Sequence, residues 1–158
     1  MSFRQLELPQ ATAGTLWLHS MPGRFETWAD FVAKAQAVRL GKIVCLTPMH
    51  ELSGLSPAYG RAVSSGELPF RFLLLPMRNF GLAGEQRAFR TGIEQVANDL
   101  RGGESVLLHC AAGIGRTGTA AACVLKTLGL TRDEALERVR AAGSDPQSAA
   151  QSGLIDAF

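Results

Sequence analysis

One cysteine and one arginine, six positions apart, are the residues of this chain best suited to chemistry on an anion. Cys110 and Arg116 lie in a segment that reads His-Cys-Ala-Ala-Gly-Ile-Gly-Arg-Thr-Gly over positions 109–118. A loop that curls round a tetrahedral anion brings such an arginine back over it, where the planar guanidinium can hold two oxygens. Backbone N–H groups of the loop and of a following helix start cradle the same anion. We call residues 110–116 the anion-binding loop.

The surroundings of Cys110 favour a reactive thiol. The apolar run 105–108 predicts a buried strand before the loop, and the alanine-rich run 119–128, closed by Gly129, predicts a helix after it. A helix start favours the anionic form of a thiol, so we expect Cys110 to be a thiolate at neutral pH. Thiolate, amides and guanidinium together provide what attack on phosphorus needs. The alternative is a glycine-rich turn with an inert buried cysteine, which is rare at an electropositive helix start.

Strands and helices alternate along the rest of the chain. Apolar runs predict strands at 14–19, 42–46, 70–75 and 105–108. Helical patterns cover 25–39, 56–64, 85–100, 119–128, 131–142 and a last segment that runs to about residue 158, while 47–54 is predicted to be a loop. The alternation predicts an α/β fold with a mainly parallel sheet of four to five strands and helices on both faces. The anion-binding loop then lies at the carboxyl ends of the strands, where such sheets bind ligands.

Composition and charge narrow the class of protein. The 158 residues, 46% hydrophobic and 19% charged, suit one globular domain over residues 1–158. A net charge of +2 without a basic run indicates no nucleic-acid partner, and no segment has the length of a membrane span or the core of a signal peptide. Three cysteines, an odd number, fit free thiols in a reducing compartment. We therefore expect a cytoplasmic protein that binds neither nucleic acid nor membrane.

The segment at 109–118 resembles the His-Cys-x5-Arg-Thr-Gly signature of cysteine-dependent protein tyrosine and dual-specificity phosphatases. The order of the other segments, over roughly residues 14–158, is similar to that of small bacterial and cyclin-kinase-associated dual-specificity phosphatases. The resemblance implies a protein tyrosine phosphatase-like fold, a phosphorylated protein as substrate, and no metal or organic cofactor.

The resemblance also implies a role for each residue of the signature. Cys110 attacks phosphorus to form a phosphocysteine, which water then hydrolyses. Arg116 and the loop amides hold the equatorial oxygens, and Thr117 hydrogen-bonds the sulfur and helps it leave. His109 is predicted to be structural rather than a proton donor. The predicted substrate-binding residues are Ala111, Ala112, Gly113, Ile114, Gly115 and Arg116.

The uncharged loop favours one class of substrate. Lipid phosphatases with this signature usually carry lysines in the loop, whereas Ala111, Ala112 and Ile114 are uncharged. A singly phosphorylated protein side chain, phosphotyrosine with phosphoserine or phosphothreonine as further candidates, is therefore preferred to a polyphosphoinositide. Three arginines are candidates for the rim of the site: Arg24, Arg78 and Arg87. The alternatives are a phosphoinositide phosphatase, a phosphate-dependent binding module, and a thiol-based arsenate reductase or sulfurtransferase, which would not need the arginine followed by Thr-Gly.

The chain departs from the family at the position of the general acid. Family members carry aspartate in a context like Pro-x-x-Asp-Phe-Gly, but here Asn79 follows Pro76 at that spacing. Asn79 is an engineered substrate trap, or native with Glu85 as the acid, or native with no acid in a slow enzyme, or part of a domain that binds without turnover. We favour the first or third explanation, because Glu85 also suits an ordinary first turn of a helix.

Two further residues have more than one interpretation. Cys45 closes a predicted strand and is by default a small buried hydrophobe; the alternative is a reversible disulfide with Cys110, as in tensin-type relatives. Gln151 corresponds to a family glutamine that positions the hydrolytic water, or else it is a helix-surface residue.

The substitution Asn79→Asp tests the missing acid. A positioned general acid is worth about 10²–10⁴ in rate, so the variant should raise turnover of phosphoserine peptides by about 10²-fold or more, and that of p-nitrophenyl phosphate much less. Steady-state rates on both substrates measure the effect. An unchanged rate on phosphoserine would show that the acid does not come from this position.

Overall fold

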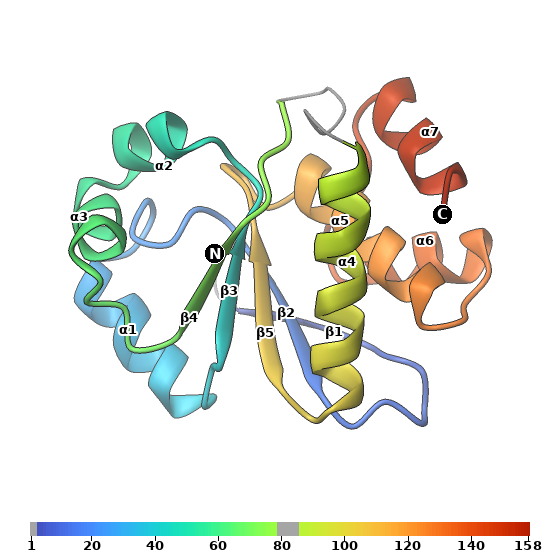
Figure 1. Cartoon of the computed structure of the whole chain (residues 1–158), viewed down its shortest axis with the longest axis horizontal. Coiled ribbons are helices and arrows are strands. Elements are labelled where there is room, and N and C mark those ends of the chain that lie inside the picture. The colour runs from blue at the N-terminus through green and yellow to red at the C-terminus, as the bar shows by residue number, and fades with distance from the viewer. Residues whose placement is uncertain (1–2, 79–85) are drawn as a thin grey trace.

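A five-stranded sheet runs through the middle of the computed structural model, which describes residues 3–78 and 86–158 (Figure 1). Its strands lie in the order β1 (Arg4–Leu6), β2 (Thr15–His19), β5 (Ser105–His109), β3 (Lys42–Cys45) and β4 (Arg71–Leu74). Strand β1 is antiparallel to β2, and all other neighbours are parallel. The prediction of a mainly parallel sheet of four to five strands is confirmed.

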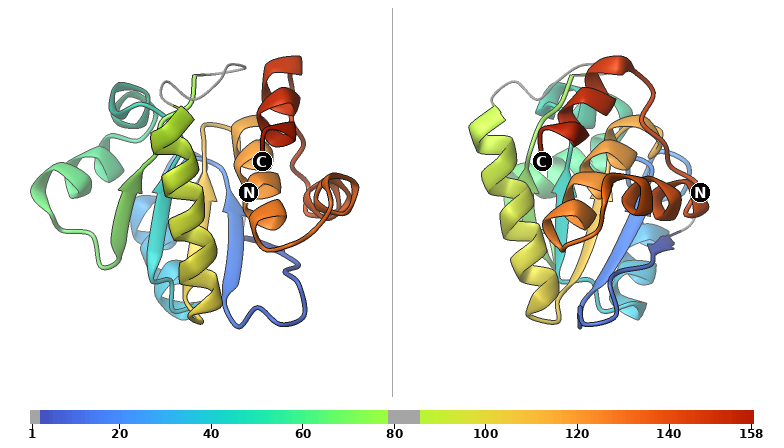
Figure 2. Two further views of the ribbon diagram at one scale, coloured as in Figure 1. Left: turned by 45° about the vertical axis from the view of Figure 1, so that its right-hand side comes forward. Right: turned by 90° about the vertical axis from the view of Figure 1, so that its right-hand side faces the viewer.

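Helices cover both faces of this sheet (Figure 2). One face carries α1 (Trp28–Ala37), α2 (Met49–Leu55) and α3 (Pro57–Ser65). The other carries α4 (Gln86–Arg101), α5 (Gly115–Thr127), α6 (Arg132–Ala141) and α7 (Ala149–Asp156). No helix of residues 3–78 or 86–158 is both long and apolar enough to cross a bilayer.

Each face of the central strand packs into its own hydrophobic cluster. In β5, Val106 and Leu108 lie in the cluster under α4–α7, and Leu107 between them lies in the cluster under α1–α3. Burial on both faces explains why the strand is a continuous apolar run rather than an alternating one. The carboxyl end of this buried strand therefore holds the anion-binding loop against a rigid core.

The structure corrects several expected boundaries. Strand β1 was not predicted, because its three residues carry no apolar pattern and are recruited by the edge of β2. The segment 47–54, predicted to be a loop, is mostly helix α2, which buries Leu52. Helix α1 begins at Trp28 rather than at 25, because the Thr27 side chain accepts from Asp30 N and caps it.

Helix α5 begins four residues earlier than predicted, at Gly115 instead of 119. The last residues of the loop thus form the first turn of the helix. This turn packs closely on the connection between α6 and α7, since a Cβ at Gly118 would lie 2.7 Å from Asp145 N. Glycine is required there by the approach of two backbones.

The substitution Gly118→Ala should therefore lower the free energy of unfolding by about 1–3 kcal/mol, as overpacking does in a close-packed interior. The matched control is Gly153→Ala in α7, where an added Cβ meets nothing within 4 Å; a helical alanine there should raise stability by about 0.5–1 kcal/mol. Urea unfolding of both variants measures the difference. Equal changes in the two would contradict the packing argument.

Candidate active site

The anion-binding loop connects the central strand to a helix. Cys110 directly follows β5, and α5 begins at Gly115. Between them Gly113 has a φ of +79°, and a Cβ there would lie 2.6 Å from His19 O. Only glycine fits this combination of backbone angle and close approach, so the turn depends on that residue.

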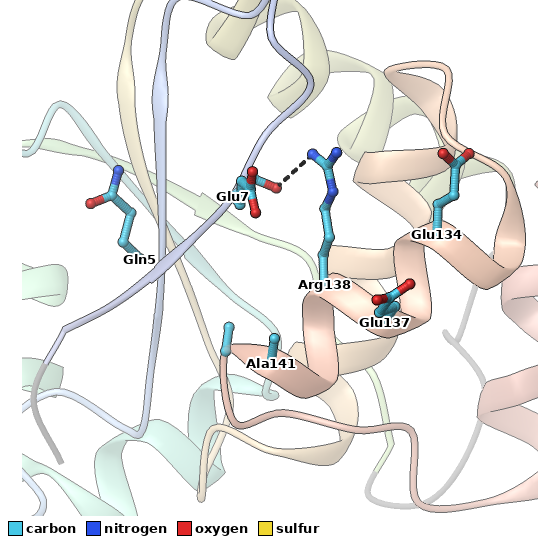
Figure 3. A pocket seen from close by; sticks show the side chains of 7 residues that line it. Gln5, Glu7, Glu134, Glu137, Arg138 and Ala141 are labelled. Carbon is cyan, nitrogen blue, oxygen red and sulfur yellow. Dashed lines mark hydrogen bonds between the residues drawn. The ribbon is translucent and has the colours of Figure 1, made fainter.

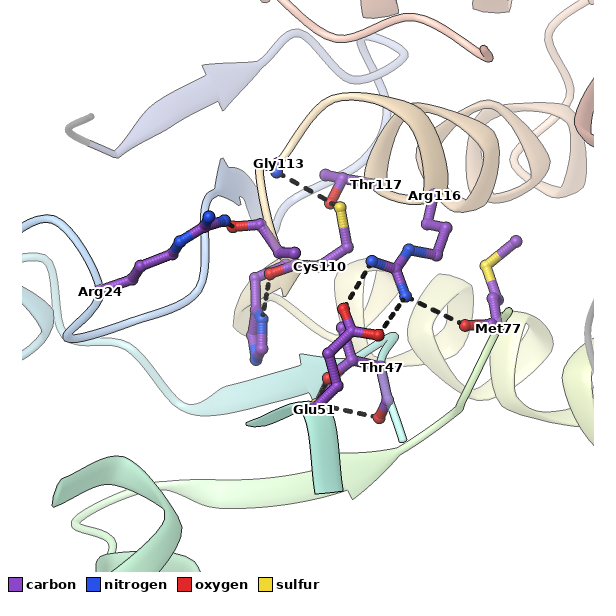
Figure 4. A network of polar contacts seen from close by, with 11 residues as sticks. Arg24, Thr47, Glu51, Met77, Cys110, Gly113, Arg116 and Thr117 are labelled. Atoms are coloured by element: carbon purple, nitrogen blue, oxygen red, sulfur yellow. Dashed lines mark hydrogen bonds and ion pairs between the residues drawn. The ribbon is translucent and has the colours of Figure 1, made fainter. Parts of the chain in front are cut away.

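The sulfur of Cys110 lies within the loop and accepts two hydrogen bonds (Figure 4). Thr117 Oγ1 donates to Cys110 Sγ over 3.0 Å, and Gly113 N donates over 3.3 Å. Thr117 is fully buried in the first turn of α5. Donors directed at a sulfur atom at a helix start favour its anionic form.

Arg116 is almost completely buried, with 3% of its surface exposed, and its guanidinium is held by a carboxylate. Its Nη1 and Nη2 donate to Glu51 Oε1 over 3.2 Å and to Oε2 over 2.7 Å, and Nη1 also donates to Met77 O over 3.2 Å (Figure 4). The bidentate pair fixes the plane and the direction of the guanidinium. Sequence reasoning missed Glu51, because it assigned 47–54 to a loop. An acidic residue three positions after Pro48 is typical of a helix start and was the signal that could have indicated α2.

A pocket of about 520 Å³ opens above the sulfur. The lining comes from the anion-binding loop, from α2, from the connection between β2 and α1, and from the connection between α6 and α7. Its residues are Arg24, Glu51, Gly54, Leu55, Cys110, Ala111, Ala112, Gly115, Arg116 and Gln147. Of the predicted substrate-binding residues, Gly113 and Ile114 are not in this lining. Their carbonyls face the connection between α6 and α7, where Ser144 Oγ donates to Gly113 O and Asp145 N to Ile114 O.

Carbonyl groups of the loop are bound by donors on its outer side. His109 Nδ1 donates to Cys110 O over 3.1 Å, and Met21 N and Arg24 Nη1 donate to Ala111 O over 3.1 and 3.0 Å. In a trans peptide the C=O and the next N–H point in opposite directions. Tying the carbonyls outward therefore turns the following amides inward, where an anion can accept from them.

His109 is buried and neutral. Tyr59 O–H donates to His109 Nε2 over 2.8 Å, while Nδ1 donates to the carbonyl of Cys110, so both ring nitrogens are occupied. Burial lowers the pKa of His109 from 6.5 to about 3. This imidazole orients the loop and has no free nitrogen with which to protonate a leaving group.

The structure separates the three candidate arginines. Arg24 lines the pocket, with its guanidinium over the Phe25 ring at 4.7 Å. Arg87 lines a different hollow, beside Arg90 and the carboxyl-terminal residues, and Arg78 is exposed. Of the three arginines, Arg24 alone lines this pocket.

The other predicted residues fall in different places. Asn79 and Glu85 lie outside the described residues. Cys45 packs in the cluster under α1–α3 and donates to Thr47 O, whereas Cys110 belongs to the other cluster. Both thiols are free in this structure, and a reversible disulfide between them stays a prediction. Gln151 is not a surface residue: it is 1% exposed, and its Oε1 accepts from Gln147 N over 2.7 Å beside the loop.

The fold and the geometry of this pocket define a cysteine-dependent phosphatase. A sequence model described as PTP-SAK, a Swiss Army Knife protein with a dual-specificity phosphatase (DSP-PTPase) domain, matches residues 15–153. The chain belongs to this family, whose members act on phosphorylated substrates. No curated protein matches the chain in sequence.

Solved structures share the fold at low sequence identity. Kinase-associated phosphatase (KAP) is 17% identical, with a TM-score of 0.83 over 98% of this chain and 92% of that chain. PTPMT1 is 16% identical, with a TM-score of 0.73 over 99% and 93%, and another of its structures is a complex with PI(5)P. The human tyrosine phosphatase-like serine/threonine/tyrosine-interacting protein is 20% identical, with a TM-score of 0.70 over 97% and 93%.

The buried His109 should make folding stability depend on pH. Folding lowers the pKa of His109, so the contribution of this residue to the stability of the fold is constant above about pH 6.5 and falls as the pH is lowered towards 3. Between pH 6.5 and about 5 the free energy of unfolding should fall, with a slope from this residue that approaches about 1.4 kcal/mol per pH unit.

The variant His109→Asn should remove that slope, whereas His50→Asn, at an exposed position, should keep it. His19, whose pKa is also lowered by burial, contributes a slope that remains in both variants. Urea unfolding at several pH values measures the three proteins. The same pH dependence in His109→Asn and the parent would show that His109 is not buried in its neutral form.

Proposed function

We propose that this phosphatase domain, residues 1–158, hydrolyses phosphotyrosine in proteins through a phosphocysteine at Cys110. One observation carries the proposal: a sulfur atom with two hydrogen-bond donors lies in the lining of a pocket that also contains the guanidinium of Arg116. Phosphoserine and phosphothreonine are further substrates of the same chemistry.

The reaction has two displacements at phosphorus. The Cys110 thiolate attacks, an S–P bond forms, and the P–O bond to the tyrosine breaks with its electron pair on the phenol oxygen. Water then attacks phosphorus and gives a proton to the solvent, and the S–P bond breaks to return the electron pair to sulfur. The hydrogen bond from Thr117 to Sγ stabilises this leaving thiolate.

Arg116 and the loop amides act on the phosphoryl group in both displacements. Charge develops on its equatorial oxygens, and donors already oriented toward them lower the barrier without reorganisation. The ion pair with Glu51 provides that orientation for Arg116, because it holds one edge of the guanidinium before substrate arrives. Glu51 is in this proposal a positioning residue.

The leaving group decides which phosphoester this site turns over fastest. With asparagine at position 79 no acid is provided from that position, so the leaving oxygen departs as an anion or takes a proton from water. The phenol of tyrosine has a pKa of about 10, well below that of an alkyl alcohol. Phosphotyrosine is therefore favoured over phosphoserine and phosphothreonine.

Two other functions have some support. Arg24 on the pocket rim supplies a positive charge that a second phosphate could use, and PTPMT1 has been crystallised with PI(5)P. Binding without turnover is supported by Asn79 and by the fold shared with a phosphatase-like interacting protein. The uncharged side chains of Ala111 and Ala112 next to the sulfur favour the phosphotyrosine reaction over the lipid one.

Turnover of p-nitrophenyl phosphate and of matched phosphotyrosine and phosphoserine peptides tests the proposal. We expect vanadate-sensitive turnover, faster on phosphotyrosine, and its loss by roughly 10⁴-fold or more in Cys110→Ser. Cys123→Ser is the matched control, because burial in α5 raises the pKa of Cys123 to about 12 and keeps that thiol unreactive. Acid quenching with labelled phosphopeptide should trap phosphate on Cys110.

Other outcomes separate the alternatives. Equal rates on the phosphotyrosine and phosphoserine peptides would contradict the claim that no general acid protonates the leaving oxygen. Faster release of phosphate from PI(5)P than from phosphotyrosine would favour the lipid reaction. Tight binding of phosphopeptide by the parent chain without phosphate release would overturn the enzymatic proposal in favour of a binding module.

A further inference from the structure

A second arginine reaches the anion-binding loop from behind. Arg4 lies in β1, and its guanidinium donates to three oxygens: Nη2 to Gly113 O over 2.6 Å, Nη1 to Ala142 O over 2.8 Å, and Nη1 to Ser144 Oγ over 2.9 Å. The family match begins at residue 15, so β1 and Arg4 precede the residues that it covers. One guanidinium thus joins the edge of the sheet, the loop and the connection after α6.

The carbonyl of Gly113 is held by two donors at once. Besides Arg4, Ser144 Oγ donates to Gly113 O over 2.7 Å. Gly143, with a φ of +88°, turns the connection so that Ser144 lies behind the loop. Because the peptide is trans, fixing Gly113 O at the back directs the N–H of Ile114 toward the front, where the anion binds.

The charge of Arg4 has no carboxylate partner among the described residues. Its three acceptors are neutral oxygens, and its Nε is buried without a hydrogen-bond partner. Burial lowers the pKa of Arg4, and the negative charge of Cys110 raises it. Arg4 is half-buried, and its guanidinium donates to oxygens of the loop and of the connection after α6 rather than to a counter-ion.

We propose that Arg4 is a positioning residue that holds the anion-binding loop in its ligand-binding geometry, with the N–H of Ile114 turned toward the bound anion. Its effect on turnover rests on the proposed phosphatase function, whereas its effect on anion binding does not and can be measured without turnover.

A purely structural role for Arg4 would be to tie the amino-terminal segment to α6. Arg138 already does this at a neighbouring point, because its Nη1 donates to Glu7 O over 3.3 Å across a hollow of about 450 Å³ (Figure 3). Among residues 3–78 and 86–158, Arg138 makes no hydrogen bond to the loop. Arg138→Gln therefore loses a similar contact of the same segment and serves as the matched control for Arg4→Gln.

The decisive measurement is the affinity of the protein for inorganic vanadate. In Arg4→Gln binding should weaken about 3- to 10-fold, the scale of one hydrogen bond of about 0.5–1.5 kcal/mol. In Arg138→Gln the affinity should not change. A lower melting temperature in Arg4→Gln with parent-like vanadate affinity would overturn the proposal, since that is what a structural contact alone predicts.

Two milder variants keep the test available if Arg4→Gln does not fold. Arg4→Lys keeps the charge and loses the planar fork; Ser144→Ala removes the other donor to Gly113 O. Both should weaken binding of inorganic vanadate to a similar extent. Parent-like vanadate affinity in both would overturn the positioning role.

These results are independent of the proposed function. A parent chain that binds vanadate, with the expected loss of affinity in Arg4→Gln, but releases no phosphate from any phosphoester would contradict the phosphatase proposal and support the role of Arg4. Normal phosphate release by the parent, together with parent-like vanadate affinity in Arg4→Gln, would do the reverse.

Discussion

The site depends on the direction of the peptide groups in one loop. An anion and a thiolate need N–H groups facing them, and each inward N–H requires the preceding carbonyl to face outward. Those carbonyls must then find donors, because a buried carbonyl without a partner is costly. The donors come from His109, Met21, Arg24, Ser144 and Arg4. The outer surface of the loop is thus as much part of the site as its inner surface.

A second constraint follows from burying a guanidinium in the same place. Arg116 is nearly inaccessible to water, and a charge in that position needs a partner. Glu51 supplies it from α2, and Met77 O supplies a further acceptor. The carboxylate also fixes the guanidinium in one orientation before any ligand binds. The same ion pair therefore neutralises the buried charge of Arg116 and preorganises it for an anion.

Much of the fold and the core of the site could be predicted from local patterns. Apolar runs marked four of the five strands, since strands buried on both faces are continuously apolar. Strand β1 and helix α2 were missed because neither has a pattern of its own; one is paired by β2, and the other is short and contains Gly54. The missed elements carry Arg4 and Glu51, so errors in short elements became errors in the site.

By itself the amino-acid sequence determined the anion-binding loop. The spacing of Cys110 and Arg116, and the glycine at 113, specify a turn between a buried strand and a helix, because these are properties of neighbouring residues. Only the tertiary structure decided which groups surround that turn. Glu51 and Arg116 are 65 positions apart, and Arg4 and Gly113 are 109 apart. Glu51 reaches Arg116 through the crossovers of the parallel strands, and Arg4 reaches Gly113 through the antiparallel pairing of β1 with β2. No local periodicity records either contact.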